Sequence, residues 1–552
     1  MHVVSDRDRS IVEFPPLGPN VTVLLVWPKF PSSYWGMEGM REILPERALM
    51  PPLALITIAA LLPAGWKIRL IDCAFQELRD SDILQSDLVM LSAMHAQRAG
   101  VHSALSLCRH LGRRTIIGGP YASSQPDELL GLADHVVVGE VDEVFPSIAA
   151  DFEGGRARRL YRVSEKPDVR RTPIPRFDLL QMDKYQAMAV QFSRGCPFQC
   201  EFCDIITIYG RRPRTKTPAQ MLEELDVLYF LGWRKLVFIV DDNFIGNHRA
   251  ALELSRELTS WQQQRNYPFT FFTEASIDLS QRPELLSAMV EANFLFVFIG
   301  IETPFPASLR EVKKYQNLRL DTLDQVRIIQ QSGLWIAAGF IVGFDADDEG
   351  IFDRQLDFIE AAAIPWAMIS LLQAPHTTPL RERMRAQGRL IENDATFSFS
   401  GALPNFRTAM APELLLGGTA RLLRELYEPE RFFNRSLHSL MCWAPRDMQR
   451  VQRIPLLYGL RSIFRSFWFQ GICSDYRAAY WRFLAQVMHR WWRDPCRLGF
   501  AISIMISAHH FRRFALELAQ KLEHEKQKVE SRSGAVPAAP SAELVDAAKL
   551  GS

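Results

Sequence analysis

Short runs of apolar residues alternate with amphipathic stretches over the first 150 residues of the chain. The stretch 52–62 opens with a proline and keeps a helical spacing of apolar residues, which is typical of a helix with proline in its first turn. Strands that alternate with helices predict a doubly wound parallel sheet. The runs rich in β-branched residues place its strands at 21–26, 67–72, 87–92, 114–119 and 135–140.

A second alternating region spans residues 188–375. A helix is predicted at 218–228, between the first two strands of this region. So many strand–helix units favour a partial or full (β/α) barrel, with its chemistry at the carboxyl ends of the strands. The predicted strands are 188–192, 235–240, 269–274, 294–302, 336–343 and 366–372.

Beyond residue 376 the pattern becomes helical, aromatic and basic. Its longest apolar run, 498–508, is about half the length that crosses a bilayer, so we expect a core helix. The fold class is therefore α/β: an N-terminal doubly wound parallel sheet, a central partial or full (β/α) barrel and a mainly helical C-terminal domain. The expected divisions are an N-terminal arm (1–19), the first domain (20–152), a linker rich in Arg and Pro (153–187), the barrel (188–375), the helical domain (376–525) and a disordered tail (526–552).

The net charge and the cysteines limit the expected partners, the compartment and the kind of site. The 552 residues carry a net charge of +1, so overall electrostatics give no reason to expect a nucleic-acid partner. The first residues do not resemble a signal peptide, and we expect a cytoplasmic protein. Of the eight cysteines, five are scattered, and we expect them to be buried or surface thiols without a function. The other three crowd together at Cys196, Cys200 and Cys203, which indicates metal ligation in a reducing compartment.

The three crowded cysteines follow the predicted strand 188–192 in the sequence C-P-F-Q-C-E-F-C. A four-iron cluster needs four ligands, so three thiolates leave one iron open to a small molecule. The alternatives are a chance grouping of cysteines and a zinc knuckle. Zinc needs a fourth Cys or His nearby, and His248 is about 45 residues away. The spacing therefore favours a 4Fe-4S cluster.

The segment 193–204, S-R-G-C-P-F-Q-C-E-F-C-D, resembles the cluster loop of the radical S-adenosylmethionine enzymes. In that family the open iron binds the amino and carboxylate groups of S-adenosylmethionine. The resemblance covers about residues 188–375. It implies that Phe202 lies against the adenine, that Asp241 and Asn243 in V-D-D-N-F hold the methionine amino group, that Glu274 meets the ribose, and that Gly300, Glu302, Gly339 and Gly343 line the adenosyl group. For the acidic residues the alternative is a helix cap, and for the glycines an ordinary turn.

The first domain resembles the cobalamin-binding domains that precede this barrel in one large subgroup. I-I-G-G-P-Y-A at 116–122 and D-H-V-V-V-G-E-V-D-E at 134–143 carry the resemblance. The D-x-H-x-x-G signature, whose histidine binds cobalt, is absent. We therefore expect cobalamin to bind without a protein histidine on cobalt, and the alternative is a domain that has lost the cofactor. His95, at a strand end, is expected to be structural, with a corrin contact as the alternative. The resemblance implies that cobalamin is lined by Ser92, Gly118, Gly119, Gly139 and Glu140.

Together these resemblances imply a radical S-adenosylmethionine, cobalamin-dependent methyltransferase that acts on an unactivated carbon. The third domain resembles the C-terminal extension of enzymes that methylate hopanoid lipids and bacteriochlorophyll precursors, which implies a hydrophobic small-molecule substrate such as a polycyclic lipid or a tetrapyrrole. An electron donor such as flavodoxin or ferredoxin would reduce the cluster. The alternatives are a radical enzyme that joins, cyclises or oxidises carbon without methylation, and an iron–sulfur redox or sensor protein, which would normally supply a fourth cysteine.

Helices rich in Trp and Arg lie in the third domain, around residues 482–493. We expect them to pack amphipathically over the mouth of the barrel. The alternatives are contact with nucleic acid and peripheral contact with a membrane, which would make the protein membrane-associated.

Overall fold

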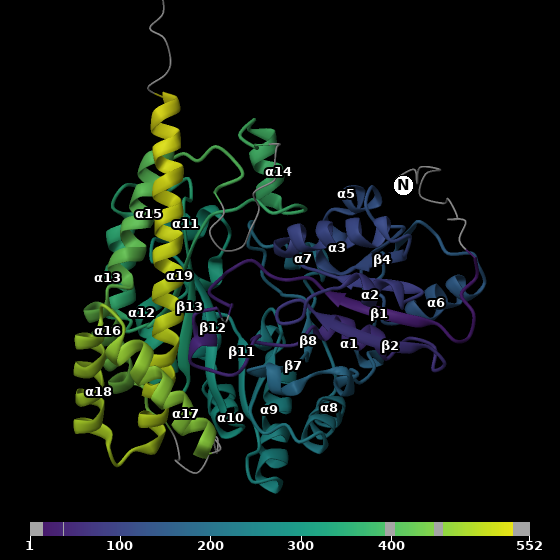
Figure 1. The fold of residues 1–552 in the computed structure, drawn as a ribbon. Coiled ribbons are helices and arrows are strands. Elements are labelled where there is room, and N and C mark those ends of the chain that lie inside the picture. The colour runs from purple at the N-terminus through teal and green to yellow at the C-terminus, as the bar shows by residue number, and fades with distance from the viewer. Residues whose placement is uncertain (1–14, 37, 392–402, 446–455, 534–552) are drawn as a thin grey trace, which may run out of the picture.

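The structure is a computed structural model that describes residues 15–36, 38–391, 403–445 and 456–533. The first domain, the barrel and the helical domain follow one another across the molecule in chain order (Figure 1). The predicted tail from residue 526 starts too early, because the last helix continues to Ser533. Ion pairs one helical turn apart, such as Lys526 with Glu530, stabilise this exposed end.

The first domain is a six-stranded parallel sheet with the order β2-β1-β3-β4-β5-β6. Alternate residues of β1 pack into separate apolar clusters, with Val23 and Leu25 in one and Leu24 and Val26 in the other, so both faces of the sheet are covered. The strands are β1 (Thr22–Trp27), β2 (Lys67–Asp72), β3 (Leu88–Ser92), β4 (Arg114–Gly118), β5 (His135–Val138) and β6 (Leu160–Arg162). The helices are α1 (Leu53–Ala59), α2 (Asp80–Leu84), α3 (Arg98–His110), α4 (Gly119–Ser124), α5 (Pro126–Leu130) and α6 (Phe145–Glu153).

Strand β6 lies inside the segment predicted as a linker. It pairs with β5 in parallel, and its Leu160 and Tyr161 are buried. With three residues it is too short to give a period-two pattern, so the sequence did not reveal it. The first domain therefore extends beyond residue 152.

The central domain is an open six-stranded parallel sheet, a partial barrel whose strands follow in chain order. Its edges are β7 and β14, and helices cover its outer face. The strands are β7 (Ala187–Val190), β10 (Leu236–Ile239), β11 (Thr270–Glu274), β12 (Phe294–Glu302), β13 (Trp335–Val342) and β14 (Trp366–Leu371). The helices are α8 (Pro218–Phe230), α9 (His248–Gln264), α10 (Pro283–Glu291), α11 (Pro306–Glu311), α12 (Thr322–Gln331) and α13 (Ile351–Ala361).

Three phenylalanines form a floor inside the barrel. Phe238 stacks on Phe272 with ring centroids 4.2 Å apart, and Phe272 stacks on Phe296 at 4.4 Å. These residues come from three adjacent strands, so their side chains share the inner face of the sheet. Residues two or four positions further along each strand point into the space above this floor.

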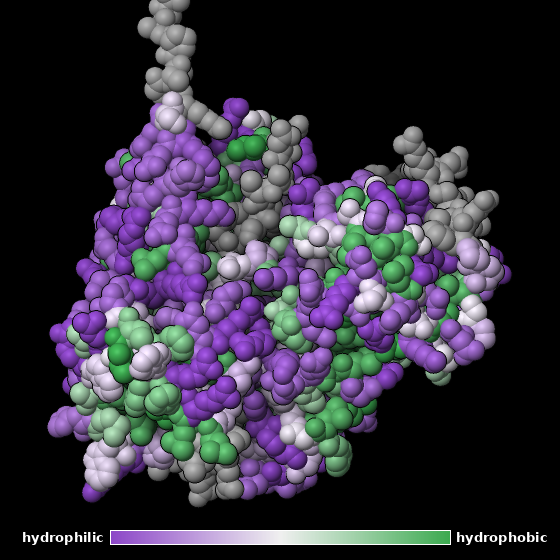
Figure 2. Space-filling model, viewed as in Figure 1, coloured by the Kyte–Doolittle hydropathy of each residue, from purple (hydrophilic) through white to green (hydrophobic). Residues whose placement is uncertain are grey.

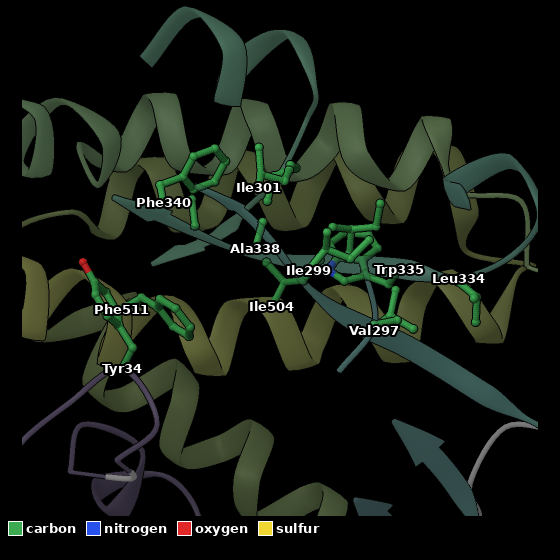
Figure 3. Close-up of a cluster of buried hydrophobic side chains, with 14 of the residues drawn as sticks. Tyr34, Val297, Ile299, Ile301, Leu334, Trp335, Ala338, Phe340, Ile504 and Phe511 are labelled. Carbon is green, nitrogen blue, oxygen red and sulfur yellow. The ribbon is translucent and has the colours of Figure 1, made fainter. Parts of the chain in front are cut away.

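The C-terminal domain covers the open side of the barrel. The Trp366 indole, on edge strand β14, donates to Ser507 Oγ at 2.9 Å and stacks on Phe511. Figure 3 shows Ile504 and Phe511 of the long last helix beside the buried residues of β12 and β13. The helices are α14 (Pro379–Ala386), α15 (Pro412–Leu426), α16 (Pro429–Cys442), α17 (Leu456–Ser466), α18 (Arg477–Trp491) and α19 (Pro495–Ser533), with a π-helical turn, η11 (Phe467–Ile472), after α17.

This arrangement differs from the expected packing of the Trp- and Arg-rich helices over the barrel mouth. The unpaired edge of β14 needs a cover, and α19 provides it. Helix α14 lies at the mouth instead, where the Leu380 N–H donates to Glu201 O in the cluster loop at 3.0 Å. The run 498–508 is a core segment as predicted, because Ala501, Ile504 and Met505 are buried. Among the described residues, no helix is long and apolar enough to cross a membrane.

Candidate active site

The cysteine loop leaves the barrel at its carboxyl edge and returns as a short hairpin. β8 (Ser193–Arg194) pairs antiparallel with β9 (Arg214–Thr215), and a short helix, α7 (Ile205–Ile208), lies in the loop between them. Two side-chain amides approach the thiols: Asn243 Nδ2 lies 3.8 Å from Cys196 Sγ, and Gln316 Nε2 lies 3.6 Å from Cys200 Sγ. Such N–H donors stabilise thiolate charge on a cluster.

The electrostatics of the loop fit an iron–sulfur cluster. Burial, followed by the nearby charges of Asp204, Cys200 and Cys196, raises the pKa of the Cys203 thiol well above its usual value. The three sulfurs therefore lie close enough to repel one another as thiolates, and cationic iron would remove that cost. Among the described residues no three metal-ligating side chains could share one ion, and a cluster does not require it because each thiolate binds its own iron.

Asp241 and Asn243 follow β10, beneath the cysteine loop. The Asp241 carboxylate accepts from the Phe192 N–H at 2.7 Å and from the Ser193 hydroxyl at 2.6 Å. Both its oxygens are thus engaged by the segment that enters the loop. Asn243 contacts Cys196 and accepts from the Ser276 N–H at 3.2 Å. Asp241 therefore fixes the loop to the barrel, and Asn243 lies beside a cysteine.

Asp242, which the sequence analysis did not select, lies half-buried beside Glu274. Its Oδ2 is buried without a hydrogen-bond partner. Burial and the charges of Asp241 and Asp204 raise the pKa of Asp242 to about 7. Burial and the charges of Asp242 and Asp241 raise the pKa of Glu274 to about 8. Two half-buried acids that repel one another form a site that a cationic ligand would complete.

Strand parity could have revealed Asp242. Phe238 and Val240 belong to the apolar cluster inside the barrel, and Asp242 is in phase with them. Glu274 is in phase with Phe272 in the same way. Asp241 is out of phase, and its side chain engages the cysteine loop instead.

Glu302 forms an ion pair with Lys314 next to the cysteines. The charges of Glu302 and Cys200 keep the pKa of Lys314 raised although burial acts to lower it. Lys314 Nζ also lies 5.7 Å from the centre of the Phe202 ring. A Cβ on Gly300 would meet this ion pair, which accounts for the glycine. Glu302 and Gly300 are thus brought together with Phe202, and Lys314 is a further site residue that the sequence analysis missed.

The two later glycines, Gly339 and Gly343, lie in different surroundings. A Cβ on Gly339 would lie 3.0 Å from the Phe298 ring, on the inner face of the barrel. Gly343 faces Leu415 of α15, and its N–H donates to Asp347 Oδ2 at 2.9 Å. Only Gly339 is therefore placed on the inner face, whereas Gly343 belongs to a turn against the helical domain.

At the carboxyl edge of the first sheet, three glycines were expected to line cobalamin, and the structure explains them in different ways. Gly119 has φ +88°, and a Cβ there would meet Ser92 Oγ at 2.5 Å. Gly139 has φ +96° and packs against the backbone of Val163. The fold itself therefore demands both glycines. Gly118 is different, because a Cβ added there would lie 3.7 Å from its nearest neighbour, Val137, and the protein itself would have room for it.

Glu140, expected among the cofactor-lining residues, is engaged across the domain boundary. Its carboxylate pairs with Arg194 at 3.0 Å and with Arg214 at 2.7 Å, and Asp142 pairs with Arg194 at 2.7 Å. Arg194 and Arg214 are the two ends of the cysteine loop. Burial acts to raise the pKa of Asp142, but Arg194 holds it below its usual range. These four side chains, which we call the interdomain ion cluster, connect the first domain to the cysteine loop. The sequence analysis missed Arg194, because it pairs with residues over fifty positions away.

The carboxyl edges of the two sheets face each other. The His95 ring, after β3, lies 5.7 Å from the ring of His376, which follows β14, and 5.1 Å from Tyr121. A flat cofactor on the first sheet would thus contact the mouth of the barrel, and Gly118 leaves backbone accessible there. This arrangement fits cobalamin at the edge of the first sheet.

Comparisons with known proteins agree with this division. Residues 47–149 match the B12 binding domain, residues 190–359 match the Radical SAM superfamily, and residues 378–524 match a domain of unknown function (DUF4070). Among curated proteins, the chain is 38% identical over 500 residues to an uncharacterized methyltransferase of Synechocystis sp., covering 90% of this chain and 93% of the relative. It is 32% identical over 527 residues to the hopanoid C-2 methylase of Rhodopseudomonas palustris, covering 94% and 98%.

Solved structures share the fold at low identity. The cobalamin-dependent S-adenosylmethionine radical enzyme OxsB, solved with aqua-cobalamin and S-adenosylmethionine, has a TM-score of 0.56 at 15% identity and covers 94% of this chain and 82% of its own. The radical S-adenosylmethionine methyltransferase TsrM from Kitasatospora setae has a TM-score of 0.54 at 16% identity, with 66% and 76% covered. Taken with the end-to-end similarity to curated methylases, these findings show that the chain belongs to the cobalamin-dependent radical S-adenosylmethionine methyltransferases.

Proposed function

We propose that the substrate is a polycyclic lipid of the hopanoid kind, methylated at an unactivated carbon. The observation that carries this proposal is the similarity to the hopanoid C-2 methylase, which covers 98% of that enzyme and so includes the helical C-terminal domain. The bacteriochlorophyllide d C-12(1)-methyltransferase of Chlorobaculum tepidum is more distant, at 25% identity over 76% of this chain. A lipid is therefore favoured over a tetrapyrrole.

The inner face of the barrel supports an apolar substrate. Phe298 is only partly buried there and lies 5.1 Å from the Trp35 ring, from the segment before α1. Ile341 and Met368, on β13 and β14, are half-buried on the same face. Above the phenylalanine floor, these side chains offer apolar contacts to a ring system, and they would exclude water from a reactive carbon.

We propose the following roles for the site residues. Cys196, Cys200 and Cys203 would hold the 4Fe-4S cluster, and Asp242 with Glu274 would face the positive charges of S-adenosylmethionine. When bound, the cluster and S-adenosylmethionine supply a radical that removes hydrogen from carbon, and cobalamin supplies the methyl group. Lining roles are proposed for Phe202, Asn243, Gly300, Glu302 and Gly339 toward S-adenosylmethionine, and for Ser92 and Gly118 toward cobalamin. The remaining predicted residues would support the structure around the site without lining a ligand. They are Asp241, Gly343, Gly119, Gly139 and Glu140.

An acidic electron carrier of the flavodoxin or ferredoxin kind is the proposed electron donor. Arg211 and Arg212 are exposed on the cysteine loop, and Arg211 contacts the carbonyl of Pro197, next to Cys196. Positive side chains beside a cluster attract an acidic partner.

A gene deletion in the source organism tests the substrate. We expect lipid extracts of the deletion strain to contain a polycyclic lipid lighter by one methyl group, as measured by mass spectrometry. The wild-type gene should restore the heavier lipid, and the gene carrying Cys200→Ala should not. A pigment lighter by one methyl group, with unchanged lipids, would show that the substrate is a tetrapyrrole. Unchanged lipids and pigments would contradict both substrate classes.

A further inference from the structure

The helix formed by α17 and η11 is inverted relative to an ordinary surface helix. Its apolar side chains recur every three or four positions, so they form one continuous stripe. That stripe points outward rather than into the protein. Its members are Leu457 (82% exposed), Leu460 (54%), Phe464 (69%), Trp468 (50%) and Ile472 (56%).

The fully buried side chains of the same helix are polar, although Phe467 and Phe469 are partly buried against apolar clusters. Ser462, Ser466 and Gln470 are buried. Ser466 Oγ lies 3.0 Å from the hydroxyl of Tyr480, and Gln470 Oε1 accepts from the Tyr476 hydroxyl at 3.2 Å. Hydrogen bonds thus fasten the helix to α18 and its N-terminal flank. An apolar stripe facing water costs free energy unless something covers it.

Helix α18 adds a second apolar stripe beside the first. Trp481, Met488 and Trp492 are exposed at helical spacing. The Trp481 indole donates to Gly471 O at 2.8 Å, and its ring lies 5.4 Å from Phe467, so the two stripes meet. We call the eight exposed residues the outer apolar surface. Figure 2 shows hydrophobic residues gathered over α17 and α18, at the lower left of the view.

Charge distinguishes between partners for this surface. Between residues 456 and 493 the chain has six arginines against one aspartate, with no lysine or glutamate. Arg461, Arg477, Arg490 and Arg493 are exposed. In a twofold contact between copies of this chain, these arginines would face one another. Anionic lipid headgroups would instead neutralise them, while tryptophans and leucines enter the boundary of the acyl chains.

We propose that the outer apolar surface docks on an anionic lipid bilayer, with α17, η11 and α18 lying in the plane of the membrane interface. The surface is derived from this chain alone, so the proposal does not rest on the identity of the methylated substrate.

Vesicle flotation of the purified full-length protein, without substrate, tests the proposal. We expect the protein to float with vesicles of phosphatidylcholine and phosphatidylglycerol, and to bind less to phosphatidylcholine alone or in high salt. The double variant Leu457→Ser/Phe464→Ser removes the two most exposed members and should lower binding about tenfold or more. Arg461→Glu/Arg493→Glu should weaken binding to the anionic vesicles selectively.

The matched control is Phe230→Ser at the end of α8, because Phe230 is 80% exposed but outside this surface. It should bind vesicles like the wild type, and equal melting temperatures would show that all variants are folded. Equal vesicle binding by the wild type and Leu457→Ser/Phe464→Ser would overturn the proposal. So would light scattering that finds a dimer which this double variant dissociates, because the surface would then be an interface between copies.

Discussion

Replacing Asp242 by Asn tests the electrostatic account of the S-adenosylmethionine site. The change removes one half-buried carboxylate charge and keeps an oxygen that can accept the hydrogen bond from the Gly195 backbone. The shape of the site is therefore preserved, and any change in the affinity for S-adenosylmethionine measures the contribution of the Asp242 charge.

The expected magnitude follows from the pKa of about 7 that burial and neighbouring acids give to Asp242. The cation of S-adenosylmethionine favours the ionised carboxylate, so protonation competes with binding below pH 7. Affinity in the wild type should therefore rise about tenfold from pH 6 to pH 8 through this group alone. The Asn variant should lose that part of the slope and bind about 1–3 kcal/mol more weakly at pH 8, roughly 5- to 150-fold.

Anaerobic calorimetry on the cluster-containing protein at several pH values measures both effects. Asp241→Asn is the matched control, since its carboxylate is bound by the loop residues Phe192 and Ser193. That variant should lose iron content, whereas Asp242→Asn should keep it. An Asp242→Asn protein with unchanged affinity and an unchanged pH slope would refute the assignment.

Three further variants address the rest of the site. Changing Cys196, Cys200 or Cys203 to Ala should abolish the iron–sulfur absorbance and the cleavage of S-adenosylmethionine, because each thiolate is a ligand without a replacement; a full cluster in any of them would contradict the ligand set. Gly118→Ala should lower cobalamin retention after gel filtration without a change in melting temperature, because the protein leaves room for its Cβ; equal retention would show that the cofactor stays away from this backbone. Arg194→Met should destabilise the domain contact by about 3–5 kcal/mol, since it leaves Glu140 and Asp142 buried without this partner; an unchanged melting temperature would contradict that. Arg194→Lys should recover part of the loss.

The sequence predicted the strands well because most are apolar runs with a largely buried centre. Strands β2 and β12 have the predicted bounds, and the other predicted strands differ by one or two residues at their ends. Strand β6 escaped because three residues give no period. The cysteine loop was also recognisable, since its ligands lie within eight positions of one another.

The residues that the sequence analysis missed depend on contacts between distant segments. Arg194 meets Glu140 and Asp142 from another domain, and Lys314 reaches Glu302 from the segment after α11. A local pattern does not carry such pairings. The expected packing of the Trp- and Arg-rich helices was wrong for a related reason: periodicity identifies an apolar stripe on a helix but does not say whether the stripe faces the core or the outside.

The central claim, methyl transfer by a cobalamin-dependent radical mechanism, is tested most directly by isotope transfer. The anaerobic protein, with its cluster and cobalamin, is given a polycyclic lipid, a reductant and S-adenosylmethionine with a trideuterated methyl group. We predict a lipid product that carries the intact trideuterated methyl group, formed together with 5′-deoxyadenosine and only when cobalamin is bound. A product without the label, or a labelled product formed equally well by protein free of cobalamin, would contradict the account.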